Sequence, residues 1–391
     1  MKKYGLKISK KKDPNAYKFG ASLPIEILEP FGDWSNYLPV KEFQNLNNIE
    51  PYACVPFTIL NCVETLIKRQ YGEERNWSDR FLSYVTDTSD GGSDPHECAE
   101  FLRKLGVPPQ ENWPFDSSIN TTEKFFARPE PKIYEIAREF LEEFDFKHED
   151  VERKHEAISE ALKCSPLLIS VYAWKRNTDG LYIKPSGARD VHATTMFQER
   201  VGEFRRVFDS YDAPHIKDYD WNAMPEVIKR FWIKKRPVYE EKLNILQRII
   251  AVLAQLIGLM YKSPQPPITP IVEPPQPKYL WDTPVLARHS VRVIADEEKL
   301  TVGQKNTMCA TIGAESGWNP KAVNYNKKNG KIVSTDYGIC QWNDYYHGKE
   351  ISPDEALNNP EKAVRLMCTY WKRGQRNLWI GYINGSYKKF L

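Results

Sequence analysis

The sequence predicts an α+β protein of two domains, and three observations support this organisation. The chain has 391 residues, 41% of them hydrophobic, and this length exceeds a single ordinary core. Between Pro264 and Pro277, seven of the fourteen residues are proline, and such a run favours extended polyproline geometry over a packed core. Amphipathic helical runs and strand-like stretches both occur outside this run. We therefore expect two folded units that a spacer separates.

The expected division of the chain has five parts. They are a basic N-terminal arm (1–32), a first domain (33–237), an apolar helix (238–262), a proline-rich linker (263–278) and a second domain (279–391). Six lysines lie between Lys2 and Lys12, and we expect a solvated arm there, without the apolar stretch of a signal peptide. No long inhibitory segment precedes the first domain, so we do not expect an autoinhibited precursor.

A candidate nucleophile lies at the start of a helical run in the first domain. Cys54 opens the amphipathic run CVPFTILNCVETLIKRQYG, and a thiol at a helix N-terminus is favoured as the reactive thiolate. His192 lies at the start of the strand-like VHATTMF, and Asp209 lies in RRVFDSYDAP. An imidazole beside the thiol and a carboxylate that orients it would complete a triad. The alternative is an inert buried cysteine and an unrelated histidine.

Several segments of this domain resemble papain-like cysteine peptidases. DWSNYLPVKEFQ (33–44) is similar to the start of the mature enzymes, SDGGSDPHECAEFLRKLGVPPQENWPF to their Gly-Gly segment and following helix, and VHATTMF and VFDSYD to the segments of their catalytic His and Asn. The resemblance implies a two-lobed α+β domain that cleaves peptides. The residues that it carries over are the nucleophile Cys54, the base His192, the orienting residue Asp209, the oxyanion donor Gln44 and the cleft residues Gly91, Gly92 and Asp94.

The first domain departs from the papain-like pattern in three ways. Nine residues separate Gln44 from Cys54, more than in the family, so part of this chain has to loop out if Gln44 is to reach the thiol. Asp209 stands where the family has Asn, which keeps an acceptor for the imidazole but adds a charge that raises the imidazole pKa. The residues on either side of the thiol also differ. An active peptidase and an inactive docking relative both remain open.

The apolar segment at 243–260 reads LNILQRIIAVLAQLIGLM. Its apolar residues recur at steps of three and four, which is the spacing of a helix-packing seam. Its length also suits a membrane, although Asn244, Gln247, Arg248 and Gln255 interrupt it. Three interpretations stay open: a helix docked on this chain or on a second copy, a membrane-contacting helix, and a free helix.

The second domain places two carboxylates on differently structured segments. Glu315 ends an apolar-periodic helical run from Val302 to Ala314, and burial beside Ile312 or Trp318 would raise its pKa. Asp336 lies in KIVSTDYGI, which predicts a short hairpin with polar groups around the carboxylate. Cleavage of a glycosidic bond uses one protonated and one ionised carboxyl group. The alternative is a solvated Glu and a capping Asp.

A second resemblance covers the core of this domain. Its segments ESGWNPKAVN and STDYGICQWN resemble animal-type lysozymes, goose-type lysozymes and soluble lytic transglycosylases, and LWIGYINGSY is similar to a segment of the transglycosylases. The resemblance implies a mostly α lysozyme-like domain with Glu315 as general acid and Asp336 as nucleophile or stabiliser. The residues that match sugar-binding or carboxylate-orienting positions are Asn324, Asn326, Gln341, Asn343 and Tyr382. Asp336 favours a retaining hydrolase, and the alternative is a lytic transglycosylase that uses Glu315 alone.

Charge and cysteine content restrict the setting. The net charge is +3, and residues 279–391 hold 16 Lys and Arg against 11 Asp and Glu, so the second domain is basic. A basic domain suits a polyanionic cell wall, and no helix combines a basic face with aromatic residues, so we expect no nucleic-acid partner. The seven cysteines show neither zinc-site nor disulfide spacing. Nothing in the sequence requires a metal or an organic cofactor.

Together these features predict a peptidoglycan-degrading glycosidase that carries a second, peptide-cleaving site. Its expected substrates are glycan strands and a peptide or protein. Two such domains without a signal peptide suggest delivery by a bacteriophage or phage-like particle, so we expect a virion-associated protein. The alternative is that the first domain is a docking module and that Glu315 alone is catalytic.

Overall fold

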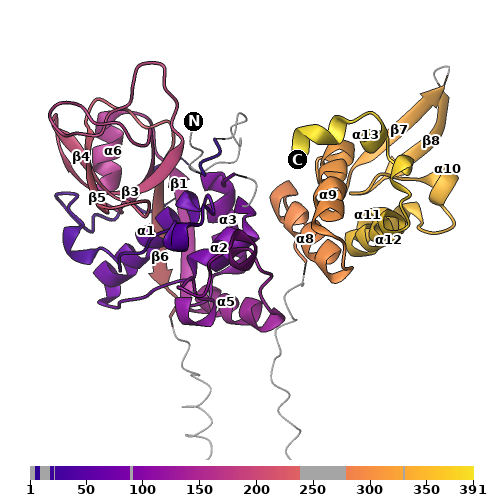
Figure 1. Ribbon diagram of the computed structural model, residues 1–391, viewed down its shortest axis with the longest axis horizontal. Helices are drawn as coiled ribbons and strands as arrows, with labels where there is room; N and C mark the ends of the chain where they lie inside the picture. The colour runs from indigo at the N-terminus through magenta and orange to yellow at the C-terminus, as the bar shows by residue number, and fades with distance from the viewer. Residues whose placement is uncertain (1–4, 9–17, 22, 89–90, 238–278, 329–330) are drawn as a thin grey trace, which may run out of the picture.

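The computed structural model describes residues 5–8, 18–21, 23–88, 91–237, 279–328 and 331–391. They form an N-terminal domain, indigo to rose in Figure 1, and a C-terminal domain, orange to yellow. The predicted helix at 243–260 and the proline-rich linker lie outside the described residues. Among the helices that are described, none has both the length and the apolar character that a membrane crossing needs.

The N-terminal domain combines helices with one antiparallel sheet. Its helices are α1 (Cys54–Tyr71), α2 (Asp79–Val85), α3 (Pro95–Leu105), α4 (Thr122–Phe125), α5 (Pro131–Glu143) and α6 (His155–Leu162), with short 3₁₀ turns η1 (Ser35–Tyr37), η2 (Leu46–Asn48) and η4 (Gln110–Asn112). Its strands are β1 (Phe144–Asp150), β2 (Leu167–Val171), β3 (His192–Arg200), β4 (Phe204–Phe208), β5 (Ile216–Asp220) and β6 (Ile228–Lys235). They pair in the order β1-β6-β2-β3-β4-β5.

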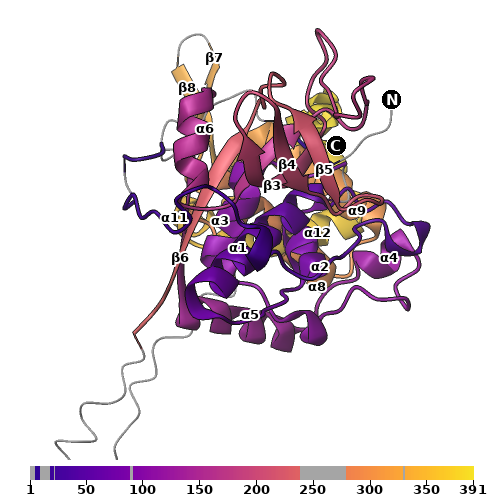
Figure 2. The same ribbon diagram turned by 90° about the vertical axis from the view of Figure 1, so that its left-hand side faces the viewer.

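Helix α1 is the central element of this domain. Every residue from Cys54 to Ile67 is buried, because the helix contacts β3 and β6 as well as α2 and α3. Gly72 ends it at φ +68°, a left-handed conformation that glycine adopts without strain. Helix α6 packs on the sheet away from α2 (Figure 2). The start of α1 therefore lies inside the domain, next to the start of β3.

Parts of the predicted N-terminal arm pack on this domain. Phe19 N–H donates to Asp150 O over 2.8 Å, and Leu28 N–H donates to Lys163 O over 3.0 Å. Leu23, between them in the chain, is buried. Contact with the domain therefore begins before residue 33, where the sequence placed the boundary.

The C-terminal domain is mostly helical, with a small sheet. Its helices are α8 (Pro284–Glu297), α9 (Val302–Ser316), α10 (Asp344–His347), α11 (Pro353–Asn358), α12 (Pro360–Lys372) and α13 (Ile380–Ile383), with 3₁₀ turns η5 (Arg376–Leu378) and η6 (Ser386–Phe390). The antiparallel sheet consists of β7 (Val323–Lys328), β8 (Lys331–Tyr337) and β9 (Trp342–Asn343), in that order. The predicted α+β class is confirmed, because helices and sheets occur in both domains.

Local sequence signals explain the two elements that carry the predicted carboxylates. A capping box between Thr301 and Gln304 begins α9, and Gly317 ends it at φ +62°. The predicted helix at 302–314 is confirmed and extends to Ser316, which places Glu315 in its last turn. The predicted hairpin is also confirmed, since β7 and β8 pair across residues 329–330.

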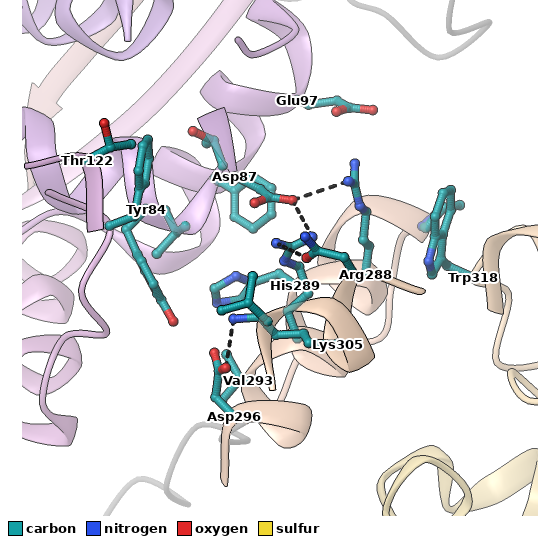
Figure 3. Close-up of a pocket in the computed structure, with 18 of the residues that line it drawn as sticks. Tyr84, Asp87, Glu97, Thr122, Arg288, His289, Val293, Asp296, Lys305 and Trp318 are labelled. Carbon is teal, nitrogen blue, oxygen red and sulfur yellow. Dashed lines mark hydrogen bonds and ion pairs between the residues drawn. The ribbon is translucent and has the colours of Figure 1, made fainter. Parts of the chain in front are cut away.

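The two domains meet along α8. Leu286 of α8 is buried in the hydrophobic core of the N-terminal domain. Asp87, just after α2, forms ion pairs with Arg288 over 3.2 Å and with Arg292 over 2.9 Å (Figure 3). A cavity of about 450 Å³ lies beside these ion pairs, lined from both domains (Figure 3). Because the contact combines an apolar anchor with ion pairs, it fixes α8 against the first domain.

Candidate active sites

Cys54 is positioned by the start of α1. It is the first residue of the helix, as the sequence predicted, and its side chain is fully buried. A thiol at this position lies in the positive potential of the helix N-terminus. Burial raises the pKa of the neighbouring thiols Cys62 and Cys98 well above the ordinary value, so these two stay protonated and unreactive.

Strand pairing brings His192 and Asp209 together. His192 is the first residue of β3, Asp209 directly follows β4, and the two strands are neighbours in the sheet. His192 Nε2 lies 2.6 Å from Asp209 Oδ1, and both side chains are fully buried. Cys54 also lies near enough to the imidazole to contribute to the increase of its pKa. Because Asp209 engages Nε2, Nδ1 is the ring nitrogen left to serve the thiol.

The protonation of His192 follows from these contacts. Burial by itself would lower the pKa of the imidazole. The negative charges of Asp209 and Cys54, together with the hydrogen bonds that both form, raise it to about 10 instead. An imidazole that is protonated at neutral pH stabilises a thiolate beside it. The contacts of His192 therefore favour its protonated form.

Asp209 has a second partner that the sequence reasoning missed. Lys217 of β5 donates from Nζ to Asp209 Oδ2 over 2.6 Å, and its side chain is buried. The ammonium lies 4.9 Å from the centroid of the Trp174 ring, which meets the His192 ring edge-on at 5.4 Å. A signal for this was present, because Lys217 and Tyr219 occupy the buried face in the alternation of β5.

Gln44 lies next to the segment that follows Asp209. Its backbone N–H donates to Ser210 O over 2.9 Å, and its side chain is fully buried. Within the described part of the chain, neither atom of its side-chain amide has a hydrogen-bond partner. A buried polar group without a partner costs about 1–3 kcal/mol, so this amide has hydrogen-bonding capacity that the described residues do not use. The turn η2 takes up part of the extra chain before Cys54.

An extended stretch of the chain itself lies beside these residues. Ser93 N–H donates to Gly5 O over 2.9 Å, and Lys7 N–H donates to Ser93 O over 3.0 Å, which forms a parallel bridge. Leu6 N–H donates over 3.4 Å to Val191 O, in the residue that precedes the imidazole. The sequence did not predict this contact between the N-terminal segment and the candidate site.

The predicted cleft glycines form one side of this contact. Gly91 and Gly92 have φ values of +91° and +114°, which suit glycine. A Cβ at Gly92 would lie 1.9 Å from Gly5 O, so only glycine allows the two backbones to approach this closely. Asp94 has a structural role, since its side chain accepts hydrogen bonds from N–H groups in the first turn of α3.

Glu315 is half-buried at the C-terminal end of α9. Its Oε1 accepts a hydrogen bond from Gly381 N–H over 2.5 Å. Burial raises the pKa of Glu315, the hydrogen bond from Gly381 opposes this, and the charge of Asp336 adds to the increase. Glu315 therefore faces a second carboxylate and keeps its proton to a higher pH than an exposed Glu.

Asp336 is held by two amides from the neighbouring strands. Asn326 Nδ2 donates to Oδ2 over 2.9 Å, and Asn343 Nδ2 donates to Oδ1 over 2.7 Å. Both amides also donate to the hydroxyl of Ser334, which tightens the network. Asn324 of β7 is exposed and lies opposite Asp336 in the sheet. The two carboxyl groups thus have different surroundings, as the sequence predicted.

The remaining predicted positions have other contacts. Gln341 donates through Nε2 to the backbone carbonyls of Gly338 and Ala322, over 2.8 and 3.4 Å, so its amide serves the local fold. Tyr382 stacks on Tyr387, with ring centroids 5.3 Å apart, and follows the glycine that binds Glu315.

Trp318 does not lie beside Glu315, where the sequence predicted it. Its ring packs on Gly313, where a Cβ would lie 2.5 Å from the ring. Its Nε1 donates to Cys309 O over 3.1 Å. Residues 313 and 315 point to nearly opposite sides of a helix, so Trp318 lies on the other side of α9.

The structure therefore brings the predicted residues into two separate groups. The first holds Cys54, His192 and Asp209, and the second holds Glu315 and Asp336. All seven cysteines are free thiols. Across the described residues, no cluster of three His, Cys, Asp or Glu side chains has a geometry that could hold a metal ion.

Among known proteins, this chain has similar solved structures but no match at the level of sequence families. No protein-family model and no curated protein matches the chain. Similar solved structures include xylellain, a cysteine protease from Xylella fastidiosa (16% identity, 58% of this chain and 94% of that chain, TM-score 0.42), and digestive procathepsin L 3 of Tenebrio molitor (11%, 55% and 72%, TM-score 0.39). The bromelain protease from Ananas comosus is a third (16%, 51% and 96%, TM-score 0.37). These structures are papain-like cysteine proteases that match about half of this chain, in its N-terminal part.

Proposed function

We propose that the N-terminal domain is a thiol peptidase. The observation that carries the proposal is the buried array in which His192 Nε2 bonds Asp209 and the imidazole interacts with Cys54, the first residue of α1. A thiolate at a helix N-terminus, paired with an oriented imidazolium, is a nucleophile with an acid beside it.

The array supplies each step of peptide hydrolysis. The Cys54 thiolate attacks the peptide carbonyl carbon, and the side-chain amide of Gln44 is a candidate donor to the developing oxyanion. The imidazolium of His192 then protonates the leaving amine, the C–N bond breaks and an acyl-enzyme remains. Water adds to the acyl carbon, His192 takes its proton, and the C–S bond breaks to release the acid and restore the ion pair.

The segment Gly5–Lys7 supports a peptide as the substrate class. Its backbone forms a parallel bridge with Ser93 and bonds the carbonyl of Val191, the residue that precedes His192. Main-chain hydrogen bonds of this kind recognise any extended peptide backbone. The contact supports a surface next to His192 that can take up a peptide backbone.

Selective alkylation of the thiol tests the peptidase proposal. Iodoacetamide at near-neutral pH is expected to modify Cys54 before the other six thiols, and His192→Ala is expected to abolish this preference. Cys164→Ser is the matched control, because Cys164 is a buried thiol outside the triad. The measurement is repeated with Lys7→Pro, which removes one of the hydrogen bonds that attach the segment Gly5–Lys7 to Ser93. Absence of preferential labelling in both backgrounds would leave the domain as a docking module.

We propose glycan cleavage as a second function, located in the C-terminal domain. The supporting observation is the pairing of a half-buried Glu315, whose pKa is raised, with Asp336, which two asparagines hold. Glu315 would protonate the leaving oxygen, and Asp336 would bind or stabilise the sugar cation. The basic charge of this domain suits peptidoglycan, and delivery by a phage-like particle remains a prediction.

Digestion of purified peptidoglycan tests the second function. Glu315→Gln is expected to abolish cleavage, because the amide cannot donate an acidic proton. Asp336→Asn distinguishes the two chemistries: hydrolysis, with reducing ends, should fail, whereas transglycosylation, with anhydro ends, should persist. Wild-type turnover by Glu315→Gln would refute the glycosidase assignment.

A further inference from the structure

We propose that Lys217 is a positioning residue that pairs with Asp209 to make a net-neutral acceptor for His192, and so sets the charge balance of the Cys54–His192 ion pair. The inference rests on the proposed peptidase function and deepens it. It explains how an aspartate can occupy a position where the family that the sequence resembles has a neutral asparagine.

The ammonium of Lys217 is surrounded by hydrogen-bond acceptors. Nζ lies 2.6 Å from Asp209 Oδ2 and 2.7 Å from Pro214 O, and further carbonyls, of Tyr211 and Asp212, lie at 3.1 and 3.2 Å. An ammonium has three N–H donors, so these oxygens satisfy it fully. The acceptors all lie on the connection between β4 and β5, which thereby closes around the amine.

Burial makes the pairing of Lys217 and Asp209 energetically important. Their side chains are 2% and 0% exposed, so an unpaired charge on either would cost several kcal/mol. Together they contribute no net charge next to His192. The imidazolium and the Cys54 thiolate then form a second neutral pair, so the net charge of the four groups is zero.

The other titratable groups around His192 leave this balance unchanged. Tyr211 faces the imidazole with ring centroids 6.0 Å apart, and its hydroxyl donates to Glu50 Oε2 over 2.6 Å. His215 bonds Asp209 O through Nδ1, and burial, with a contribution from Lys217, lowers its pKa, which favours the neutral form. Cys98 lies near Cys54, and burial keeps it protonated.

The balance makes opposite predictions for the two single changes. Without Lys217, the Asp209 charge is uncompensated, and the imidazole holds its proton to higher pH. Without the Asp209 charge, the Lys217 ammonium is unpaired and opposes the imidazolium, which then loses its proton at lower pH. With both charges removed, the acceptor is neutral again.

Alkylation of Cys54 by iodoacetate tests the inference. Iodoacetate is an anion, so its rate of reaction falls on the alkaline side when the imidazolium loses its proton. Relative to wild type, Lys217→Met is expected to move this fall to higher pH, and Asp209→Asn to lower pH, each by on the order of one pH unit. The double variant Asp209→Asn/Lys217→Met is expected to return it close to the wild-type position. Lys229→Met is the control, because Lys229 is a buried lysine of β6 that pairs with Asp150 of β1, outside the candidate site.

The outcomes separate the inference from the function on which it rests. Failure of wild-type Cys54 to react preferentially would overturn both. Preferential reaction of Cys54 with the rate falling at the same alkaline pH in all variants would overturn the role of Lys217 alone. A lysine with a merely structural role would change the amount of folded protein, but not the pH at which the rate falls. If one single variant does not fold, the other single variant decides: a fall displaced in its stated direction supports the inference, and a fall at the wild-type position overturns it.

Discussion

At the scale of single residues, one close neighbour holds a carboxylate in each candidate site. Lys217 balances Asp209 in the first domain, and the backbone of Gly381 holds Glu315 in the second. The candidate catalytic side chains could be named from the sequence, because their residue types and local motifs are distinctive. Their partners could not, because a lysine on a strand and a glycine in a loop have many ordinary uses.

The position of Glu315 depends on the absence of a side chain at Gly381. A Cβ there would lie 3.0 Å from Glu315 Oε1 and 3.0 Å from Ala314 Cβ, so one of them has to move. We expect Gly381→Ala to reduce glycan cleavage roughly ten- to a hundredfold, because small displacements of an acid are costly. Gly303→Ala, which meets no atom within 4 Å, should retain wild-type turnover in the same assay. Equal rates for both variants would contradict this role.

Buried Glu64 makes the stability of the first domain depend on pH. Burial raises the pKa of Glu64 well above its ordinary value of 4.5, although the hydrogen bond from Trp77 N–H opposes this. The folded state therefore binds the proton more tightly, and this stabilisation is lost as pH rises from about 4.5 through the raised pKa. We expect Glu64→Gln to weaken the fall of the melting temperature between acidic and alkaline pH. Exposed Glu111→Gln should keep the wild-type slope, and an unchanged slope in Glu64→Gln would refute the prediction.

At the scale of elements, the helix starts and the hairpin follow from local sequence signals. The contact of the N-terminal segment with the first domain does not. The capping box of α9 and the run that begins at Cys54 are visible in the sequence, and both helices begin where predicted. The segment Gly5–Lys7 has no such signal, because its contacts are backbone hydrogen bonds that any residue other than proline can form. Only the folded chain shows that it lies beside His192.

Removal of one backbone donor from this segment is expected to increase access to Cys54. Lys7→Pro removes the N–H that donates to Ser93 O, and a hydrogen bond of this kind contributes about 0.5–1.5 kcal/mol. We therefore expect the rate of Cys54 alkylation to rise roughly two- to tenfold. Lys7→Ala retains the backbone donor and controls for the side chain. A rate no higher than that of Lys7→Ala would show that the segment does not cover the thiol.

At the scale of the whole molecule, α8 connects the two domains. Leu286 lies in the core of the first domain, and Asp87 forms ion pairs with Arg288 and Arg292 beside the cavity in Figure 3. The sequence predicted two domains and a spacer, but not this contact. The two candidate sites lie in different domains, and this contact holds the two domains together.

Loss of Asp87 is expected to loosen this contact. Asp87→Ala leaves two partly buried guanidinium groups without this partner, which costs about 1.5–3 kcal/mol. We expect hydrogen exchange over α8 to become roughly tenfold faster or more, measured by mass spectrometry. Glu152→Ala removes an exposed ion pair with Lys154 and should leave α8 unchanged. Equal protection of α8 in both variants would show that the apolar contact alone fixes the helix.

The sequence by itself determined the α+β class, the helix at Cys54, the helix and hairpin that carry Glu315 and Asp336, and the identity of the candidate catalytic side chains. These depend on periodicity, caps and motifs within short stretches of chain. The tertiary structure decided the charge balance of Asp209 with Lys217, the backbone contact of Gly5–Lys7 and the docking of α8. These depend on which strands pair and which surfaces meet, and such long-range contacts leave no local pattern in the residues that form them.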